Sequence, residues 1–150
     1  MATGGNIKRI RKLKGMTQKE LGMAIGFDQR TADVRMAQYE TGTRTPKENY
    51  INALAQVLDV HPAALTTPDI DNYTGLIHTL FTLEDMYGLK IGEIDGEICL
   101  RLDKHSKNYL SLFDMFLAWN TEAGKLESGE ITKEEYDHWR YNYPRHETGR

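Results

Sequence analysis

The chain has 150 residues, of which 39% are hydrophobic and 27% are charged, as is usual for a soluble globular protein of one domain or of a small domain with an appendage. Its single cysteine, Cys99, excludes an internal disulfide, and the sequence has neither an apolar run of membrane-spanning length nor an N-terminal signal-peptide core. These features predict a cytoplasmic protein that is not embedded in a membrane.

Charge is divided unevenly along the chain, although the whole chain carries only −3. Residues 1–68 hold ten Lys and Arg against six Asp and Glu, a net charge of +4. Residues 69–150 hold nine Lys and Arg against sixteen Asp and Glu, a net charge of −7. A basic N-terminal segment followed by an acidic C-terminal segment is typical of a protein that binds a polyanion. The alternative is that both segments merely have charged, solvated surfaces.

The first helix is expected to follow a disordered start over residues 1–5. Asn6 can cap this helix, in which Ile7, Ile10 and Leu13 repeat at helical spacing. The opposite face carries the basic residues Lys8, Arg9, Arg11, Lys12 and Lys14. We expect at least one of Arg9, Arg11 and Lys12 to contact a phosphate, and the alternative role of this face is solubility.

A capping box opens the second helix. Thr17 is followed three residues later by Glu20, so the hydroxyl and the carboxylate can each satisfy a backbone N–H group at the helix start. Residues 21–25 place an apolar face on this helix, and Gly26 is expected to end it. A further helix with many polar side chains follows. Two short helices around a glycine turn are the plan of a helix-turn-helix.

The start of that further helix has two candidates. If Asp28 is the cap, the helix begins at Gln29 and has about three turns. If Thr31 is the cap, residues 28–30 form a longer turn that could contact DNA on its own.

The next helix is expected at residues 46–58. Thr45 can cap it, Pro46 suits its first position, and Glu48 completes a second capping box. Its apolar residues are numerous enough to make it a core helix, and they are Tyr50, Ile51, Leu54, Ala55, Val57 and Leu58. A short closing helix follows at Pro62, where His61 occupies the cap position.

Three motifs together resemble the XRE family, the helix-turn-helix proteins of the phage lambda repressor and Cro type. The motifs are TQKELGMAIG at residues 17–26, AQYETGTRTP at residues 37–46 and LAQVLDVHPAAL at residues 54–65. The resemblance covers Asn6 to Leu65 and implies a sequence-specific transcriptional regulator that binds double-stranded DNA, in the simplest case a repressor that occupies an operator. The interval from Gly26 to Glu40 is longer than is usual in the family, so either the recognition helix or the turn before it is extended.

The resemblance also implies two groups of DNA-binding residues. Counting back from Tyr39 and Glu40, the base-reading positions are Asp33, Val34, Arg35 and Gln38, and an extended helix would add Gln29, Arg30 and Thr31. Arg can pair with guanine and Gln with adenine through two hydrogen bonds. Gln18 is expected to contact a phosphate and to brace the recognition helix, and the other phosphate contacts are expected at Thr43, Arg44, Thr45 and Lys47.

The acidic half matches no family motif that we can place. Its apolar periodicity predicts a helix from Tyr73 that ends at Gly88. Two alternating runs, residues 89–94 and 97–102, are joined by Asp95-Gly96 and predict a β-hairpin with a type I′ turn. Helices are expected over residues 107–125 and 133–141, the second with Thr132 as its cap. The predicted fold is therefore mainly α, with a five-helix lambda-repressor-like domain at residues 1–67 and a small acidic α+β domain at residues 68–150.

The acidic domain has more apolar side chains than one hairpin can cover. We expect part of this surface to form a homodimer interface, and the alternatives are that it packs on the first domain or fills its own core. A second functional hypothesis is an antitoxin-like or adaptor-like module whose C-terminal half binds a protein partner. The histidines are scattered without metal-ligand spacing and no phosphate-binding glycine loop is present, so we expect no enzyme activity, no metal and no cofactor.

Overall fold

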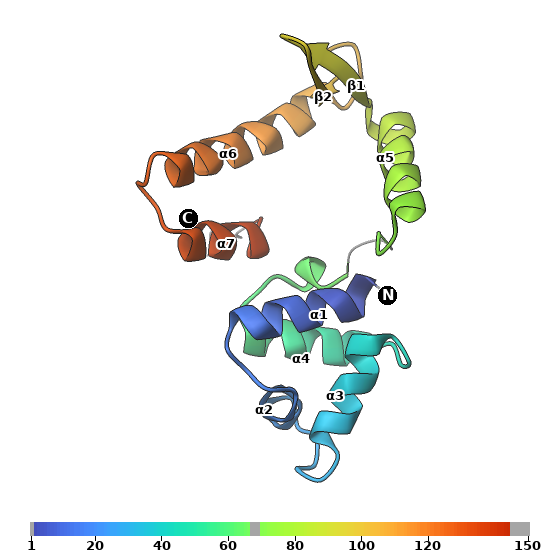
Figure 1. Ribbon diagram of the computed structural model, residues 1–150, viewed down its shortest axis with the longest axis vertical. Helices are drawn as coiled ribbons and strands as arrows, with labels where there is room; N and C mark the ends of the chain where they lie inside the picture. Colours follow the sequence, from blue (N-terminus) through green and yellow to red (C-terminus); the bar gives the residue numbers. More distant parts are fainter. Residues whose placement is uncertain (1, 67–69, 145–150) are drawn as a thin grey trace. The chain divides into compact units, whose positions relative to one another are not determined.

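The computed structural model describes residues 2–66 and 70–144 and is mainly α-helical (Figure 1). The described residues fall into two compact units. We call the residues up to Asp71, together with those from His138 onward, the head unit, and residues 72–137 the hairpin unit. The predicted boundary between residues 67 and 68 lies outside the described residues.

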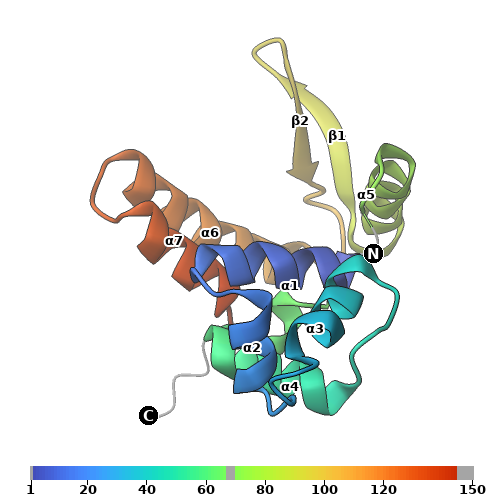
Figure 2. The ribbon, with the colours of Figure 1, turned by 60° about the horizontal axis from the view of Figure 1, so that its bottom comes forward.

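The head unit is built from short helices around one core (Figures 1 and 2). They are α1 (Ala2–Leu13), α2 (Gln18–Ala24), α3 (Ala32–Thr41), α4 (Glu48–Leu58) and the short 3₁₀ helix η1 (Pro62–Ala64). α1 contacts α3 and α4, and α2 packs against both α3 and α4. The largest fully buried side chains form the centre of the core, and they are Ile7, Ile10, Leu21, Met36, Leu54, Leu58 and Leu65. The five predicted helical segments are thus confirmed.

The N-terminus differs from the prediction, because α1 already begins at Ala2. The expected disorder is therefore wrong for residues 2–5, while Met1 lies outside the described residues. Asn6 is inside the helix and buried, and its side-chain amide donates a hydrogen bond to the Leu65 carbonyl at 3.3 Å. A Cβ added at Gly4 would lie 2.4 Å from the Tyr39 carbonyl oxygen. Gly4 is thus needed for the close approach of α1 to α3, and this packing outweighs the low helix propensity of glycine.

Among the helix caps predicted for the head unit, those at Thr17 and His61 are right, and those at Asn6 and Thr45 are wrong. The Glu20 N–H donates to the Thr17 hydroxyl at 3.0 Å and the Thr17 N–H to the Glu20 carboxylate at 2.9 Å, which confirms the capping box. His61 caps η1, since its Nδ1 accepts from the Ala63 N–H at 3.0 Å. The expected capping box at Thr45 is wrong. α4 begins at Glu48, because Lys47 is extended (φ −73°, ψ 165°) and the preceding proline is buried in the loop.

The last turn of α7 (Lys133–Tyr141) and the described residues directly after it belong to the head unit. The His61 N–H donates to the Tyr141 carbonyl at 2.8 Å, and the Asn142 side-chain amide donates to the Asp59 carbonyl at 3.1 Å. The Tyr141 side chain packs against the core of the head unit. The segment from His138 to Asn142 is therefore a structural part of the head unit.

Replacing Tyr141 with alanine should lower the free energy of unfolding by about 1–2 kcal/mol, because the partly buried ring would no longer cover the core. Urea denaturation followed by circular dichroism measures this. Tyr141→Phe is the matched control, since it keeps the ring and should unfold like the wild type. If Tyr141→Ala were as stable as the wild type, the segment would not be docked on the head unit in solution.

The hairpin unit contains α5 (Tyr73–Tyr87), β1 (Leu89–Ile94), β2 (Glu97–Leu102), α6 (Tyr109–Glu127) and the start of α7. The strands pair antiparallel, with Leu89 opposite Leu102 and Ile94 opposite Glu97. Asp95 and Gly96 both have positive φ, 51° and 83°, which confirms the type I′ turn. α5 contacts β1, and α6 contacts β2. Figure 2 shows α5 beside the two strands.

The hairpin unit has no core of its own among its described residues, none of which is buried. Large apolar side chains are instead exposed on both helices and on both strands. They are Tyr73, Leu76, Ile77, Phe81, Met86, Tyr87, Ile91, Ile94, Ile98, Leu100, Leu110, Phe113, Met115, Leu117 and Trp119. The alternative that this region fills its own core is therefore wrong for its described residues. No helix in the described part of the chain is long and apolar enough to cross a membrane.

Candidate nucleic-acid interface

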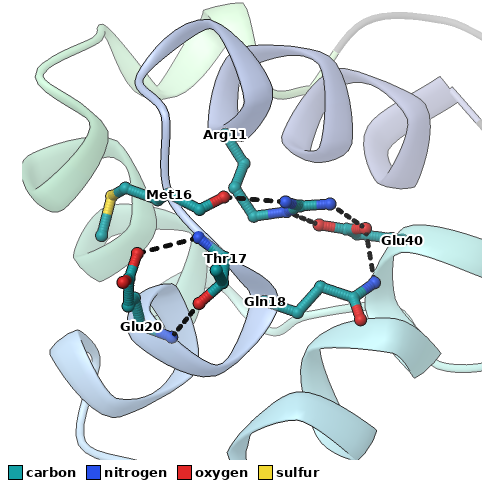
Figure 3. A network of polar contacts seen from close by, with 6 residues as sticks. All are labelled: Arg11, Met16, Thr17, Gln18, Glu20 and Glu40. Atoms are coloured by element: carbon teal, nitrogen blue, oxygen red, sulfur yellow. Dashed lines mark hydrogen bonds and ion pairs between the residues drawn. The ribbon is translucent and has the colours of Figure 1, made fainter.

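A buried ion pair joins α1 to α3 (Figure 3). The Arg11 Nε donates to one Glu40 carboxylate oxygen at 2.5 Å, and a terminal guanidinium nitrogen donates to the other at 3.1 Å. Arg11 also donates to the Met16 carbonyl at 2.8 Å. The two residues are only 8% and 7% exposed. Arg11 is thus a structural residue whose guanidinium is occupied, whereas Arg9 and Lys12 are exposed. The expectation that at least one of the three contacts a phosphate stays a prediction.

Gln18 extends this network to α2. It is the first residue of α2, and its side-chain amide donates to the Glu40 carboxylate at 2.8 Å (Figure 3). Glu40 therefore accepts hydrogen bonds from residues of two other helices. This contact gives a physical basis for the predicted bracing of α3 by Gln18, and the phosphate contact of Gln18 stays a prediction.

α2 and α3 approach each other very closely at their facing ends. A Cβ added at Gly22 would lie 2.6 Å from the Ala32 carbonyl oxygen, so only glycine allows this distance. Gly26 ends α2 with a φ of 97°, in the left-handed region that favours glycine. The two glycines set the geometry of the turn that leads into α3.

The turn between α2 and α3 is extended, as the second of the two alternatives predicted. α3 begins at Ala32, with Thr31 at the N-cap position but without a side-chain cap hydrogen bond. The Asp28 side chain instead accepts from the Arg30 N–H at 2.8 Å, which stabilises the turn itself. Gln29, Arg30 and Thr31 are exposed and belong to this turn rather than to the helix.

The predicted base-reading residues of α3 lie on its outer side. Asp33 and Val34 are exposed, and Arg35 and Gln38 are half-buried. The opposite side of α3 is buried and carries Ala32, Met36, Tyr39 and Glu40. α3 therefore presents a mixed polar and apolar strip to solvent.

An aromatic cluster supports one of these residues. The rings of Phe27, Tyr39 and Tyr50 contact one another, with centroids 5.2–6.3 Å apart. The Arg35 guanidinium carbon lies 3.6 Å from the centroid of the Phe27 ring and 5.9 Å from that of Tyr50. The guanidinium is therefore held against the cluster by a cation–π contact.

The loop after α3 carries the remaining predicted DNA contacts. Gly42 has a φ of 80° and ends the helix. The Arg44 N–H donates to the Gln38 carbonyl at 3.1 Å, and the hydroxyls of Thr41 and Thr43 are 3.0 Å apart. The predicted phosphate contacts in this loop are all exposed, and they are Thr43, Arg44, Thr45 and Lys47. Within the described ranges, no group of three or more potential ligands is arranged to hold a metal ion.

Sequence reasoning missed the two contacts that fix this surface. The Arg11–Glu40 pair joins residues 29 positions apart, and the alternation of basic residues in α1 gave no signal that one of them turns inward. The contact between Phe27 and Arg35 gave no signal either, because Phe27 lies in the turn and Arg35 in α3, eight positions further along the chain.

The short helices around a glycine-ended turn, with α3 facing solvent along one side, define a helix-turn-helix domain. A family model described as helix-turn-helix matches residues 7–65. The chain is also 37% identical over 65 residues to the uncharacterized HTH-type transcriptional regulator y4dJ of Sinorhizobium fredii, a match that covers 43% of this chain and 79% of the relative. This chain belongs to the helix-turn-helix family, of the XRE type that its motifs predicted.

A solved structure, that of the transcriptional regulator BswR, is similar over 57% of this chain and 95% of its own chain. The two sequences are 28% identical, and the TM-score is 0.43.

Proposed function

We propose that this protein is a transcriptional regulator that binds double-stranded DNA sequence-specifically and represses by occupying its operator. The observation that carries the proposal is the solvent-facing surface of α3 and of the turn before it. Polar side chains project from this surface, and the opposite side of α3 is fixed in the core. The Arg11–Glu40–Gln18 network and the close contact at Gly22 hold that backbone in place. A rigid short helix with outward polar side chains suits insertion into the major groove.

The proposal gives two roles to the residues of the head unit, whose residues 1–67 would form the DNA-binding domain. Base edges would be read by Gln29, Arg30, Thr31, Asp33, Val34, Arg35 and Gln38. Phosphates would be held by Gln18, Thr43, Arg44, Thr45 and Lys47. The similarity to the HTH-type transcriptional regulator of Sinorhizobium fredii supports this class of function.

We also propose that two copies join through the hairpin unit, within the acidic region 68–150. α5 and α6 are apolar over most of their surface, and helices of this kind are normally buried in protein. A twofold axis would let the same face of each copy cover the other. The two heads could then bind half-sites about 34 Å apart on a pseudo-palindromic operator in the cytoplasm.

The second candidate function uses the same surface. An antitoxin-like or adaptor-like protein would cover the apolar side chains of the hairpin unit with a different protein rather than with a second copy. Light scattering on the purified full-length chain distinguishes the two. A dimer at micromolar concentration supports the first proposal, and a monomer supports the second.

The first experiment is fluorescence anisotropy at two salt concentrations, with random duplex and with duplex selected by iterative binding. We expect the selected duplex to bind on the order of a thousandfold more tightly than random DNA, with affinity that falls steeply as salt rises. Weak binding without any enriched sequence would contradict the proposed function.

Replacing Lys47 with alanine should weaken binding to selected and random duplex by the same factor, because a phosphate contact carries no sequence information. The slope of log affinity against log salt should fall by about one. Lys104→Ala is the matched control, since it removes an exposed lysine from the hairpin unit. A loss confined to one operator sequence would show that Lys47 reads bases instead.

A further inference from the structure

We infer that Phe27 is a positioning residue that presents Arg35 to a guanine in the operator, and this inference rests on the proposed function. Phe27 belongs to the extended turn and Arg35 to α3, so the contact between them joins the two parts of the recognition surface. The inference adds a buried aromatic residue to the determinants of sequence preference.

A guanidinium group has a planar face and an edge that carries its N–H donors, and in this structure the face of Arg35 lies over the ring of Phe27. The Arg35 guanidinium carbon lies 3.6 Å from the centroid of the Phe27 ring, which is van der Waals contact. In the part of the chain that the structure describes, the side chain of Arg35 forms no hydrogen bond or ion pair with another residue. The ring thus holds the guanidinium by its charge and its face, while its N–H donors are left for a ligand.

The ring itself is held firmly. Phe27 is 5% exposed, and its centroid lies 5.2 Å from that of Tyr50 and 6.0 Å from that of Tyr39. Tyr39 precedes Glu40, whose carboxylate is fixed by Arg11 and Gln18. The position of the Phe27 ring is therefore set by the same network that sets α3. A long flexible side chain that rests on this ring loses less freedom when it binds.

The place of Arg35 in α3 favours guanine over a phosphate as the partner of its free donors. The guanidinium fork matches O6 and N7 of guanine in the major groove, the commonest specific contact between an arginine and a base. Arg35 lies in the first half of α3, the part of a recognition helix that reaches base edges. A residue of the loop after α3 would be better placed for the backbone.

The test uses full-length protein and the selected duplex, together with duplexes in which each base pair is replaced in turn. Arg35→Lys keeps the charge but not the fork, and should reduce the preference for guanine at one position by roughly 5- to 150-fold. Phe27→Leu keeps an apolar side chain but not the ring. It should reduce the preference at that same position, with affinity for random duplex and the salt slope unchanged.

Two further variants complete the test. Phe27→Tyr keeps an aromatic face and should retain the guanine preference. The double variant Phe27→Leu, Arg35→Lys should lose no more preference than Arg35→Lys alone, since the two residues act through one contact. All variants are compared at a temperature below the melting temperature of the least stable one. Arg35 is half-buried at the surface, so Arg35→Lys tests the guanine contact without altering the core.

The outcomes distinguish this inference from the proposed function. If no duplex can be enriched, the proposed function fails. If a duplex is enriched but Arg35→Lys weakens every sequence equally, Arg35 binds a phosphate and the inference fails. If Arg35→Lys loses the guanine preference while Phe27→Leu keeps it, Arg35 reads the base but Phe27 does not position it, and the inference is overturned.

Discussion

Replacing Glu40 with alanine is expected to lower the free energy of unfolding by about 3–5 kcal/mol. Arg11 is 8% exposed, so its charge would stay buried without a counter-charge, and the Gln18 amide would lose its acceptor. Small domains have a total stability of about 5–15 kcal/mol, so the variant should be partly unfolded near 37 °C. Chemical denaturation followed by circular dichroism, with thermal melting beside it, measures the change.

A double variant tests the cause of this loss. Arg11→Met together with Glu40→Leu removes both charges and replaces them with apolar side chains of similar size, which is often neutral or stabilising for a buried ion pair. This variant should regain most of the stability. If it is as unstable as Glu40→Ala, the loss does not come from an unpaired buried charge.

The same double variant also separates stability from DNA binding. It should fold, yet Gln18 would no longer be held against α3 by a carboxylate, as it is at 2.8 Å in the native chain. We therefore expect weaker DNA binding from a stable protein. Full affinity in the double variant would show that the ion pair serves folding alone.

The parts of the fold that follow from local chemistry could be predicted from the sequence. The Thr17–Glu20 capping box joins residues within one helical turn, and the type I′ turn needs only Asp95 and Gly96. In both cases the interacting groups are neighbours in the chain. Local propensity therefore decides the structure.

Contacts between distant segments could not be predicted in this way. Gly4 lies in a small-residue segment that is typical of a disordered terminus, and the carbonyl of Tyr39 that makes glycine necessary there belongs to another helix. Arg11 is one of several basic residues in α1, and it differs from the others only because Glu40 lies opposite it. Each position depends on how the helices pack and not on its neighbours in sequence.

In the candidate site, too, the local features could be predicted. Counting back from Tyr39 and Glu40 placed Asp33, Val34, Arg35 and Gln38 on α3, and the structure puts all four outside the core. The start of α3 was open between two caps of similar propensity. The structure decides it, because Asp28 uses its side chain inside the turn and accepts from the Arg30 N–H.

Replacing Phe113 with glutamate should convert the protein from a dimer into a monomer, if the proposed contact through the hairpin unit is right. Phe113 is 42% exposed on α6, beside the exposed Leu110 and Leu117. A second copy that covers this side of α6 would bury the new carboxylate without a partner. The acidic region already carries −7 in each copy, which adds repulsion. Light scattering measures the mass, and circular dichroism checks that the helices persist.

DNA binding should change in a way that only dimerisation explains. Two linked heads bind a palindrome more tightly than one by about 10²–10⁴-fold, without any new contact to DNA. Phe113→Glu should lose this factor on the full operator and keep wild-type affinity for a duplex with a single half-site. Ser111→Glu is the matched control, because helical spacing puts Ser111 on the same side of α6 as Asp114, Glu122 and Lys125, and it should leave the dimer intact. If Phe113→Glu remains dimeric and binds the full operator like the wild type, the two copies meet elsewhere or the apolar surface serves a different partner.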